Sequence, residues 1–134
     1  MARGLPGMHE RFEVTTDDRL QAIDITDRVE DALPADAGGA RTVRSRHTTA
    51  GVVVNEAESR LMDDIETVLA EVVPDEGWHH DEIDDNADSH LRALLCGSGE
   101  TLPVRDGRLD LGTWESVVLV ECDGPRTRTM EVFG

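Results

Sequence analysis

The chain has 134 residues, the usual size of one domain, and carries a net charge of −16 from 29 acidic and 13 basic residues. Nucleic-acid binding and adsorption to anionic membranes both need clustered cations, so this charge disfavours both. The sequence has no apolar run of about 18 residues and no basic N-terminal segment followed by an apolar stretch, which predicts a cytoplasmic protein without a membrane span.

All the basic residues are arginine, and the acids are spread along the whole chain rather than gathered in a tail. The acidity is therefore interpreted as a property of the surface and not as a binding motif. In molar salt the Debye length is about 3 Å, so an acidic surface repels itself little there. The composition favours a halophilic source, a high-GC genome, or both. Cys96 and Cys122 lie in apolar surroundings and are expected to be buried, reduced thiols.

The N-terminal third is predicted to hold one strand and one short helix. Residues 1–8 are expected to be a loose leader, and residues 10–15 alternate between polar and apolar as a strand does. Residues 24–33 are typical of a short helix that Pro34 stops, with Thr26 as its N-cap.

Two strands and the longest helix are predicted next. Residues 41–45 indicate a strand. Residues 51–55 indicate another, which is apolar on both faces and is therefore expected to be central in its sheet. A helix is predicted over residues 56–73, because apolar residues recur there at three- and four-residue spacing. The residues of this apolar face are Ala57, Leu61, Ile65, Val68, Leu69 and Val72.

A polar loop over residues 75–85 is expected to lead into a second main helix. Asp85 or Asn86 is predicted to cap this helix, which runs to Leu95. Its apolar residues Leu91, Leu94 and Leu95 are predicted to face inward.

The C-terminal third changes to strand periodicity. Residues 101–105 and 108–111 flank Asp106-Gly107, which is a strong hairpin signal. Further strands are predicted over residues 116–121 and 127–133. Arg126 and Arg128 alternate at the last strand, and both arginines are expected to face solvent. The sum is an α+β fold in a single domain over residues 1–134, a mostly antiparallel sheet or sandwich with two main helices.

Three histidines lie in short polar segments and are the first candidates for chemistry. His47 follows the second predicted strand, His80 lies in the polar loop beside Asp81, and His90 lies at the start of the second main helix. Neutral imidazole is a common ligand of zinc and similar metals. A site for a divalent metal (Zn or Mg) is therefore one reading. Ordinary surface or capping histidines and metal-free acid–base chemistry are the others. His79 is expected to be solvated.

Polar residues near these histidines have two readings each. Asn55 and Glu56 either cap the long helix, or Glu56 orients a histidine or a metal-bound water. Asp85 is placed near enough to His90 to orient it. Gly97-Ser98-Gly99 either stops a helix or presents backbone N–H groups to an anion.

An ordered set of short motifs through most of the chain resembles the YjbQ family, also called the secondary thiamine-phosphate synthase family. The matching stretches are His47-Thr48-Thr49-Ala50, Asn55-Glu56, His80-Asp81, Asp85-Asn86, Ser89-His90, Leu94-Leu95-Cys96-Gly97-Ser98, Leu102-Pro103-Val104, Asp106-Gly107-Arg108, Leu111-Gly112-Thr113-Trp114 and Gly124-Pro125-Arg126.

The resemblance implies a homotrimer with a polar pocket near a subunit boundary. It implies weak thiamine-phosphate synthase activity, which joins hydroxymethylpyrimidine diphosphate to thiazole phosphate and releases pyrophosphate. The residues expected to carry this function are given by role. The catalytic set is His47, Asn55, Glu56, Asp85 and His90, the substrate-binding set is Thr48, Gly97 and Ser98, and the metal-binding set is His47, His80 and His90.

Two other functional classes use the same sequence features. One is a non-catalytic trimer that binds a metal or a small phosphorylated metabolite at the same residues. The other is an interaction protein whose trimer matters more than its pocket. The imidazoles also leave the ligand open, because neutral rings bind metals whereas protonated rings bind phosphate.

Overall fold

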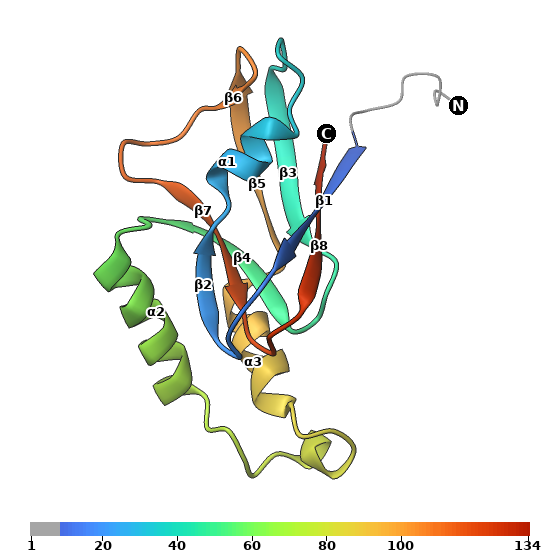
Figure 1. The fold of residues 1–134 in the computed structure, drawn as a ribbon, viewed down its shortest axis with the longest axis vertical. Coiled ribbons are helices and arrows are strands. Elements are labelled where there is room, and N and C mark those ends of the chain that lie inside the picture. Colours follow the sequence, from blue (N-terminus) through green and yellow to red (C-terminus); the bar gives the residue numbers. More distant parts are fainter. Residues whose placement is uncertain (1–8) are drawn as a thin grey trace.

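A computed structural model describes residues 9–134 of the chain. They form two antiparallel sheets and three α-helices, which confirms the predicted α+β class (Figure 1). The leader predicted at residues 1–8 lies outside the described residues. Within residues 9–134, no helix has the length and apolar character needed to cross a membrane.

The strands make a five-stranded sheet of order β1-β8-β3-β5-β6 and a three-stranded sheet of order β2-β7-β4. In chain order the elements are β1 (His9–Thr15), β2 (Gln21–Asp24), α1 (Thr26–Asp31), β3 (Gly39–Ser45), β4 (Ala50–Asn55), α2 (Ser59–Val72), the 3₁₀ helix η2 (His79–Glu82), α3 (Ala87–Cys96), β5 (Gly99–Arg105), β6 (Arg108–Leu109), β7 (Ser116–Glu121) and β8 (Thr127–Phe133).

The main hydrophobic core lies between the two sheets. Val43 and Val132 of the five-stranded sheet pack there with Val52 and Leu119 of the three-stranded sheet, and all four are fully buried. Helix α1 adds Val29 to the same core. A second, smaller core lies on the other face of the three-stranded sheet, where α2 and α3 cover it. The molecule therefore has three layers, of sheet, sheet and helices.

Strand β7 is the central strand of the smaller sheet, and the expectation that residues 51–55 take this place is wrong. Val117 and Leu119 of β7 face the main core, whereas Val118 and Val120 face the helices. All four are fully buried. Strand β4 is an edge strand, and it is apolar on both faces because α3 packs on one of them.

Helix α3 turns the opposite face inward from the one predicted. Leu94 and Leu95 are 74% and 60% exposed, whereas Asp88 and Arg92 are 1% and 5% exposed. The Arg92 guanidinium is paired with Asp88 at 2.5 Å, and Asp88 is also paired with Arg19 at 2.8 Å. An apolar pattern cannot reveal this face, because two of its buried positions are charged; they pair with each other and with groups on other elements.

Arg92 also explains how α3 is joined to α2. Its Nε donates to the carbonyl oxygen of Leu69, and its Nη2 donates to that of Val73. These carbonyls lie at the C-terminal end of α2, where no complete further helical turn supplies N–H donors; the Leu69 carbonyl also accepts the N–H of Val73. The Arg92 side chain therefore donates to two carbonyls at the end of α2 and fixes α3 beside that helix.

The first helix begins later than predicted. Strand β2 at Gln21–Asp24 precedes α1, and its pairing with β7 was not anticipated. Thr26 is the first helical residue and not the N-cap. Its hydroxyl oxygen accepts from the backbone N–H of Val117, at 2.9 Å. Thr26 therefore joins α1 to β7 rather than closing the start of the helix.

The hairpin predicted at Asp106-Gly107 is present between β5 and β6. Both turn residues have positive φ, 52° for Asp106 and 77° for Gly107. This is the backbone of a two-residue turn whose twist matches that of the flanking strands. The local chemistry of these two residues was enough to predict the connection.

Candidate functional site

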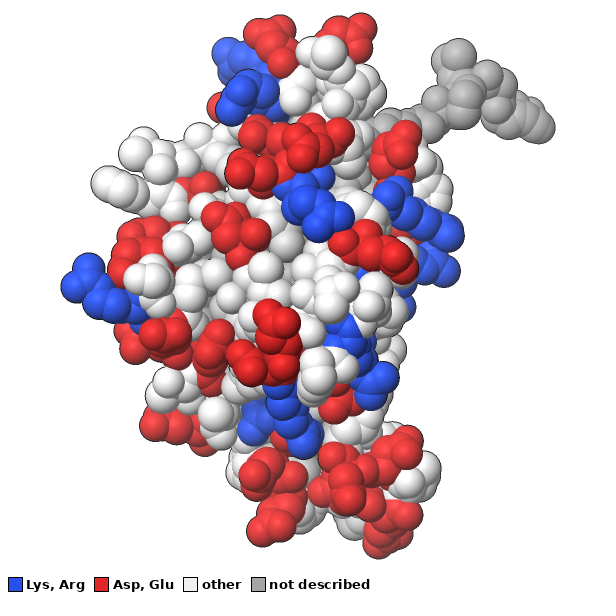
Figure 2. Space-filling model, in the orientation of Figure 1, with Lys and Arg blue, Asp and Glu red and all other residues white. Residues whose placement is uncertain are grey.

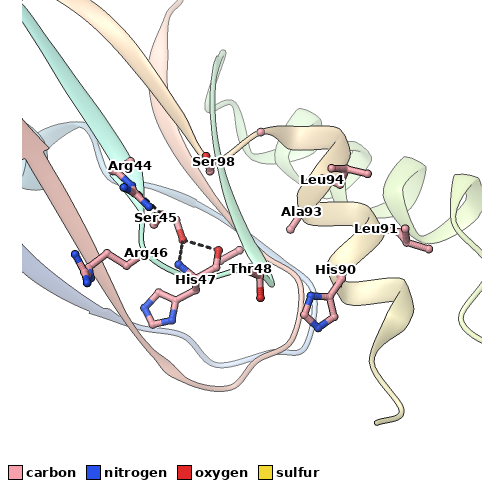
Figure 3. A pocket seen from close by; sticks show the side chains of 12 residues that line it. Arg44, Ser45, Arg46, His47, Thr48, His90, Leu91, Ala93, Leu94 and Ser98 are labelled. Carbon is pink, nitrogen blue, oxygen red and sulfur yellow. Dashed lines mark hydrogen bonds between the residues drawn. The ribbon is translucent and has the colours of Figure 1, made fainter. Parts of the chain in front are cut away.

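A pocket of about 620 Å³ lies between the β3–β4 connection and helix α3 (Figure 3). Its position is set by the two sheets, which bring the end of β3 beside the end of α3. The lining residues are Arg44, Ser45, Arg46, His47, Thr48, Ala50, His90, Leu91, Ala93, Leu94, Gly97 and Ser98.

Close backbone contacts fix the wall that α3 contributes. The N–H of Val52 donates to the carbonyl of Gly97 at 2.9 Å, and the N–H of Ser45 donates to that of Ser98 at 2.8 Å. A Cβ on Gly51 would lie 2.7 Å from both the Cβ of Cys96 and the carbonyl oxygen of Gly97. The glycine therefore lets the C-terminal end of α3 rest directly on β4.

His47 is held in a single orientation at the pocket wall. Its Nε2 accepts the backbone N–H of Thr129 at 2.9 Å, so a neutral ring carries its proton on Nδ1. Its own backbone N–H donates to the hydroxyl of Ser45 at 3.0 Å. Burial, together with the charge of Arg128, lowers the pKa of His47 below the ordinary 6.5. The ring is therefore a neutral hydrogen-bond donor at neutral pH.

A buried ion pair lies close to His47, and it corrects the expectation that Arg128 faces solvent. Arg128 is 2% exposed, and Glu121 is fully buried. The Arg128 Nε donates to Glu121 at 2.8 Å, and its Nη2 donates to Glu121 and to the hydroxyl of Thr49. The pair ties β7 and β8 to the β3–β4 connection that carries His47.

The pocket is divided into a cationic side and an apolar side. Figure 3 shows Arg44 and Arg46 on the β3 side and Leu91 and Leu94 on the α3 side. Hydroxyl groups of Ser45, Thr48 and Ser98 are also in the lining. The lining includes no aspartate or glutamate, although the chain has 29 acidic residues. The arrangement fits an anionic group joined to an apolar or aromatic body.

His80 and His90 meet at the α3 end of this region. Their rings are 5.0 Å apart between centroids and lie edge to face. The His80 Nε2 donates to the amide oxygen of Asn86 at 3.1 Å, and the Asn86 Nδ2 donates to Asp123 at 3.2 Å. His90 lines the pocket, whereas His80 is outside the lining and contacts the ring of His90.

The histidines of one chain do not fit a metal site. Within residues 9–134 no three His, Cys, Asp or Glu side chains form a group that could hold a metal ion. The lone pair of Nε2 in His47 already accepts the Thr129 N–H, and binding through Nδ1 would instead place a proton on Nε2 facing that N–H. In His80 the Nε2–H donates to Asn86, which leaves only the Nδ1 of that ring as a possible ligand.

The other predicted site residues divide into two groups. Thr48, Gly97 and Ser98 line the pocket with His47 and His90.

Asn55, Glu56 and Asp85 are placed elsewhere in this chain. Asn55 lies at the other end of β4 from the pocket residue Ala50, which corresponds to about 17 Å along a strand. Its side chain accepts the N–H of Glu56, and Glu58, not Asn55 or Glu56, caps α2. Asp85 is exposed and is not in the lining.

Arg44 and Arg46 were missed as site residues. Their signal in the sequence is alternation with Ser45 at the end of a strand, in a chain whose cations are scarce. Without knowledge of distant residues, the same alternation indicates only a solvent-facing strand edge. Helix α3, from a distant part of the chain, forms the opposite wall of the pocket that these arginines line.

The similarity to known proteins is not confined to the short motifs and extends over nearly the whole chain. A family model described as UPF0047 protein YjbQ-like matches residues 10–133. The chain belongs to the YjbQ-like UPF0047 family. A UPF0047 protein of Methanothermobacter thermautotrophicus is 45% identical over 126 residues, which cover 92% of this chain and 88% of that relative.

Solved structures of YjbQ-like proteins share the fold. A hypothetical protein from Aeropyrum pernix K1 is 43% identical with a TM-score of 0.88, covering 92% of this chain and 95% of its own. A structure from Sulfolobus solfataricus P2, described as a YbjQ-like protein of unknown function, is 38% identical with a TM-score of 0.86 and 95% coverage of both chains. The resemblance inferred from the motifs is thus confirmed for the family and the fold.

Proposed function

We propose that the pocket binds a small phosphorylated metabolite and that the protein is a weak thiamine-phosphate synthase. The observation that carries this proposal is the acid-free lining, with two arginines, three hydroxyl side chains and two histidines in a chain of net charge −16. Arginine and hydroxyl groups are the usual protein donors to phosphate oxygens.

The proposed reaction needs stabilisation of a leaving group more than it needs proton transfer. The thiazole nitrogen forms a bond to the methylene carbon of the pyrimidine, and the carbon–oxygen bond to the diphosphate breaks. Pyrophosphate leaves with the electron pair, and the thiazole becomes a thiazolium cation. Arg44, Arg46 and the Nδ1–H of His47 would donate to the departing charge.

A divalent cation is assigned in this proposal to the diphosphate substrate and not to a histidine cluster. Magnesium commonly binds substrate phosphates and retains several of its waters, so it does not require a closed set of protein ligands. The lining of one chain gives it no carboxylate. Magnesium, rather than zinc, is therefore the expected requirement.

A second candidate function is binding of the same class of ligand without turnover. The lack of a lining carboxylate favours it, since no carboxylate in one chain's pocket would bind the metal ion of a metal-bound diphosphate. Both candidates predict phosphate binding, and only the first predicts product.

The test combines both substrates and magnesium with the purified protein and measures thiamine phosphate by its fluorescence after oxidation. Arg46→Gln and His47→Gln should each lower the rate at least tenfold, because each removes a donor to the leaving group. Arg105→Gln is the matched control, because Arg105 is an exposed arginine on β5 outside the pocket. Saturable binding of the substrates without product would support the second candidate.

We propose also that copies of the chain associate, as a homotrimer, through an apolar surface beside the pocket. Val72, Trp78, Leu94 and Leu95 are exposed and line a shallow cleft between the end of α2 and α3. Association would also explain why Asn55 and Glu56 lie away from His47 in one chain, since a neighbouring copy could supply them. Sedimentation equilibrium should give three chains per particle, and Leu95→Glu should give single chains.

A further inference from the structure

A cluster of cations surrounds one carboxylate on the outer face of the five-stranded sheet, next to the pocket. The carboxylate of Glu131 on β8 accepts from His9 at 2.7 Å, from Arg11 at 3.3 Å and from Arg46 at 2.9 Å. The Arg44 Nε lies 3.8 Å from its other oxygen. These four side chains, three of them arginines, come from β1, β3 and the β3–β4 connection.

The strand register builds this cluster. Arg11 of β1 and Arg44 of β3 are both paired with Glu131, one on each side of β8. The neighbours Met130 and Val132 point into the core, so Glu131 points outward. It is nevertheless only 3% exposed, because the surrounding side chains cover it.

A glycine leaves room for one of these arginines. Gly99 of β5 is paired with Arg44 on the side away from β8. A Cβ on Gly99 would lie 3.0 Å from the Cβ of Arg44 and 2.8 Å from the carbonyl oxygen of Val43. A larger residue at this position would displace Arg44, whose side chain also lines the pocket.

The cluster keeps an excess of positive charge and of hydrogen-bond donors. Three guanidinium groups face one carboxylate. Arg11 and Arg44 approach Glu131 through Nε, and their terminal Nη groups make no hydrogen bond within residues 9–134. Figure 2 shows several basic side chains close together on the side of the molecule that carries β1 and β8, and others elsewhere among the acidic side chains.

We propose that this cluster is a second anion subsite, so that the protein binds a ligand, or a pair of ligands, with two phosphate groups. One phosphate would lie in the pocket, and the other would bind the free Nη groups of Arg11 and Arg44. Glu131 is then a positioning residue that holds the arginines by one nitrogen each and leaves the others free. The inference rests on the proposed function for the first phosphate only. Arg44 and Arg46 belong to both subsites, which makes the subsites contiguous.

The test measures binding by isothermal titration calorimetry at low ionic strength. The probes are butyl phosphate, which carries one phosphate, and straight-chain alkanediol bisphosphates from four to eight carbons, which carry two. The wild-type chain should bind at least one bisphosphate about tenfold or more tightly than butyl phosphate, because the second contact is made within one complex. Arg11→Gln should remove that advantage and leave the affinity for butyl phosphate unchanged, since Arg11 does not line the pocket.

Arg105→Gln is the control, because it removes the same charge from another exposed arginine of the same sheet. Equal affinity for the one- and two-phosphate probes would overturn the inference, as would equal losses in Arg11→Gln and Arg105→Gln. The proposed function is tested separately, by comparing the affinity for butyl phosphate of the wild-type chain with that of His47→Gln. Butyl phosphate binding without a bisphosphate advantage would reject the second subsite alone. Bisphosphate binding that depends on Arg11 but not on His47 would reject the pocket alone.

Discussion

At the scale of single residues, the ion pair of Arg128 and Glu121 is the feature that supports the candidate site. Glu121 also accepts the hydroxyl of Thr16 at 2.8 Å and the N–H of Asp123 at 3.0 Å. Both carboxylate oxygens of Glu121, and the Nε and Nη2 groups of Arg128, are therefore hydrogen-bonded in the interior. Removal of one partner would leave an uncompensated buried charge, which costs more than the pair as a whole contributes.

We expect Arg128→Met to lower the free energy of unfolding by about 3–5 kcal/mol, because the buried Glu121 carboxylate then loses the opposite charge that compensates it. The double variant Arg128→Met with Glu121→Met should be more stable than the single one. Urea titration followed by circular dichroism measures both. Arg105→Met, which breaks an exposed pair with Asp110, should change the free energy by no more than about 1 kcal/mol. A double variant less stable than the single one would contradict this account of the pair.

Glu131 gives a second prediction at this scale, for acid stability. The hydrogen bond from His9, with further help from Arg46 and Arg11, lowers the pKa of Glu131 from the ordinary 4.5 to about 2, although burial opposes this. A carboxyl with a lowered pKa stabilises the fold fully above its unfolded pKa and loses that contribution as pH falls to the folded value.

The free energy of unfolding should therefore fall with decreasing pH between about 4.5 and 2, and Glu131→Gln should fall less steeply over the same window. Urea titrations at a series of pH values give the two slopes. Identical slopes for the wild-type chain and Glu131→Gln would show that this carboxyl does not titrate as described.

At the scale of elements, the docking of α3 on β4 decides the shape of the pocket. The helix is amphipathic, but its apolar residues Leu94 and Leu95 are outside and its ion pair of Asp88 and Arg92 is inside. The contact at Gly51 sets how closely the helix approaches the sheet. The pocket wall therefore depends on Gly51, a backbone position that is not itself part of the pocket lining.

Gly51→Ala should destabilise the protein by about 1–3 kcal/mol, because the added methyl group meets Cys96 and the Gly97 carbonyl. It should also weaken binding of butyl phosphate, since Gly97 and Ser98 would shift with the end of α3. Thermal unfolding and calorimetry measure the two effects. Gly38→Ala is the control, because its Cβ would have only one neighbour, 3.9 Å away. Equal effects of the two substitutions would refute the close docking of α3.

At the scale of the whole molecule, the acidity is spread over the surface, and Figure 2 shows more acidic than basic side chains on the face in view. Several of the arginines form ion pairs with three buried carboxylates, those of Glu131, Glu121 and Asp88. Repulsion among the surface acids opposes the compact state at low salt and is screened at high salt.

The melting temperature should therefore rise between low salt and molar KCl, as expected of a halophilic protein. Differential scanning calorimetry measures the shift. Molar sorbitol, which does not screen charge, should raise the melting temperature less than KCl does. A melting temperature that stayed constant or fell with KCl would contradict the halophilic interpretation.

The sequence by itself determined most elements and the family, because these depend on local patterns. The hairpin follows from Asp106-Gly107, and the polar motifs from His47 to Gly124-Pro125-Arg126 identify the YjbQ-like family. The small strand β2 was missed because four residues carry too little periodicity to be recognised.

Only the tertiary structure decided which charged residues lie inside and which residues share a pocket. Arg128 reads as a solvent-facing strand residue until Glu121 and Thr49 are brought beside it. Arg44 and His90 lie 46 positions apart in the sequence and face one pocket because α3 rests on β4. The physical reason is that a buried charge needs partners from other elements, and no local periodicity records where those partners will be.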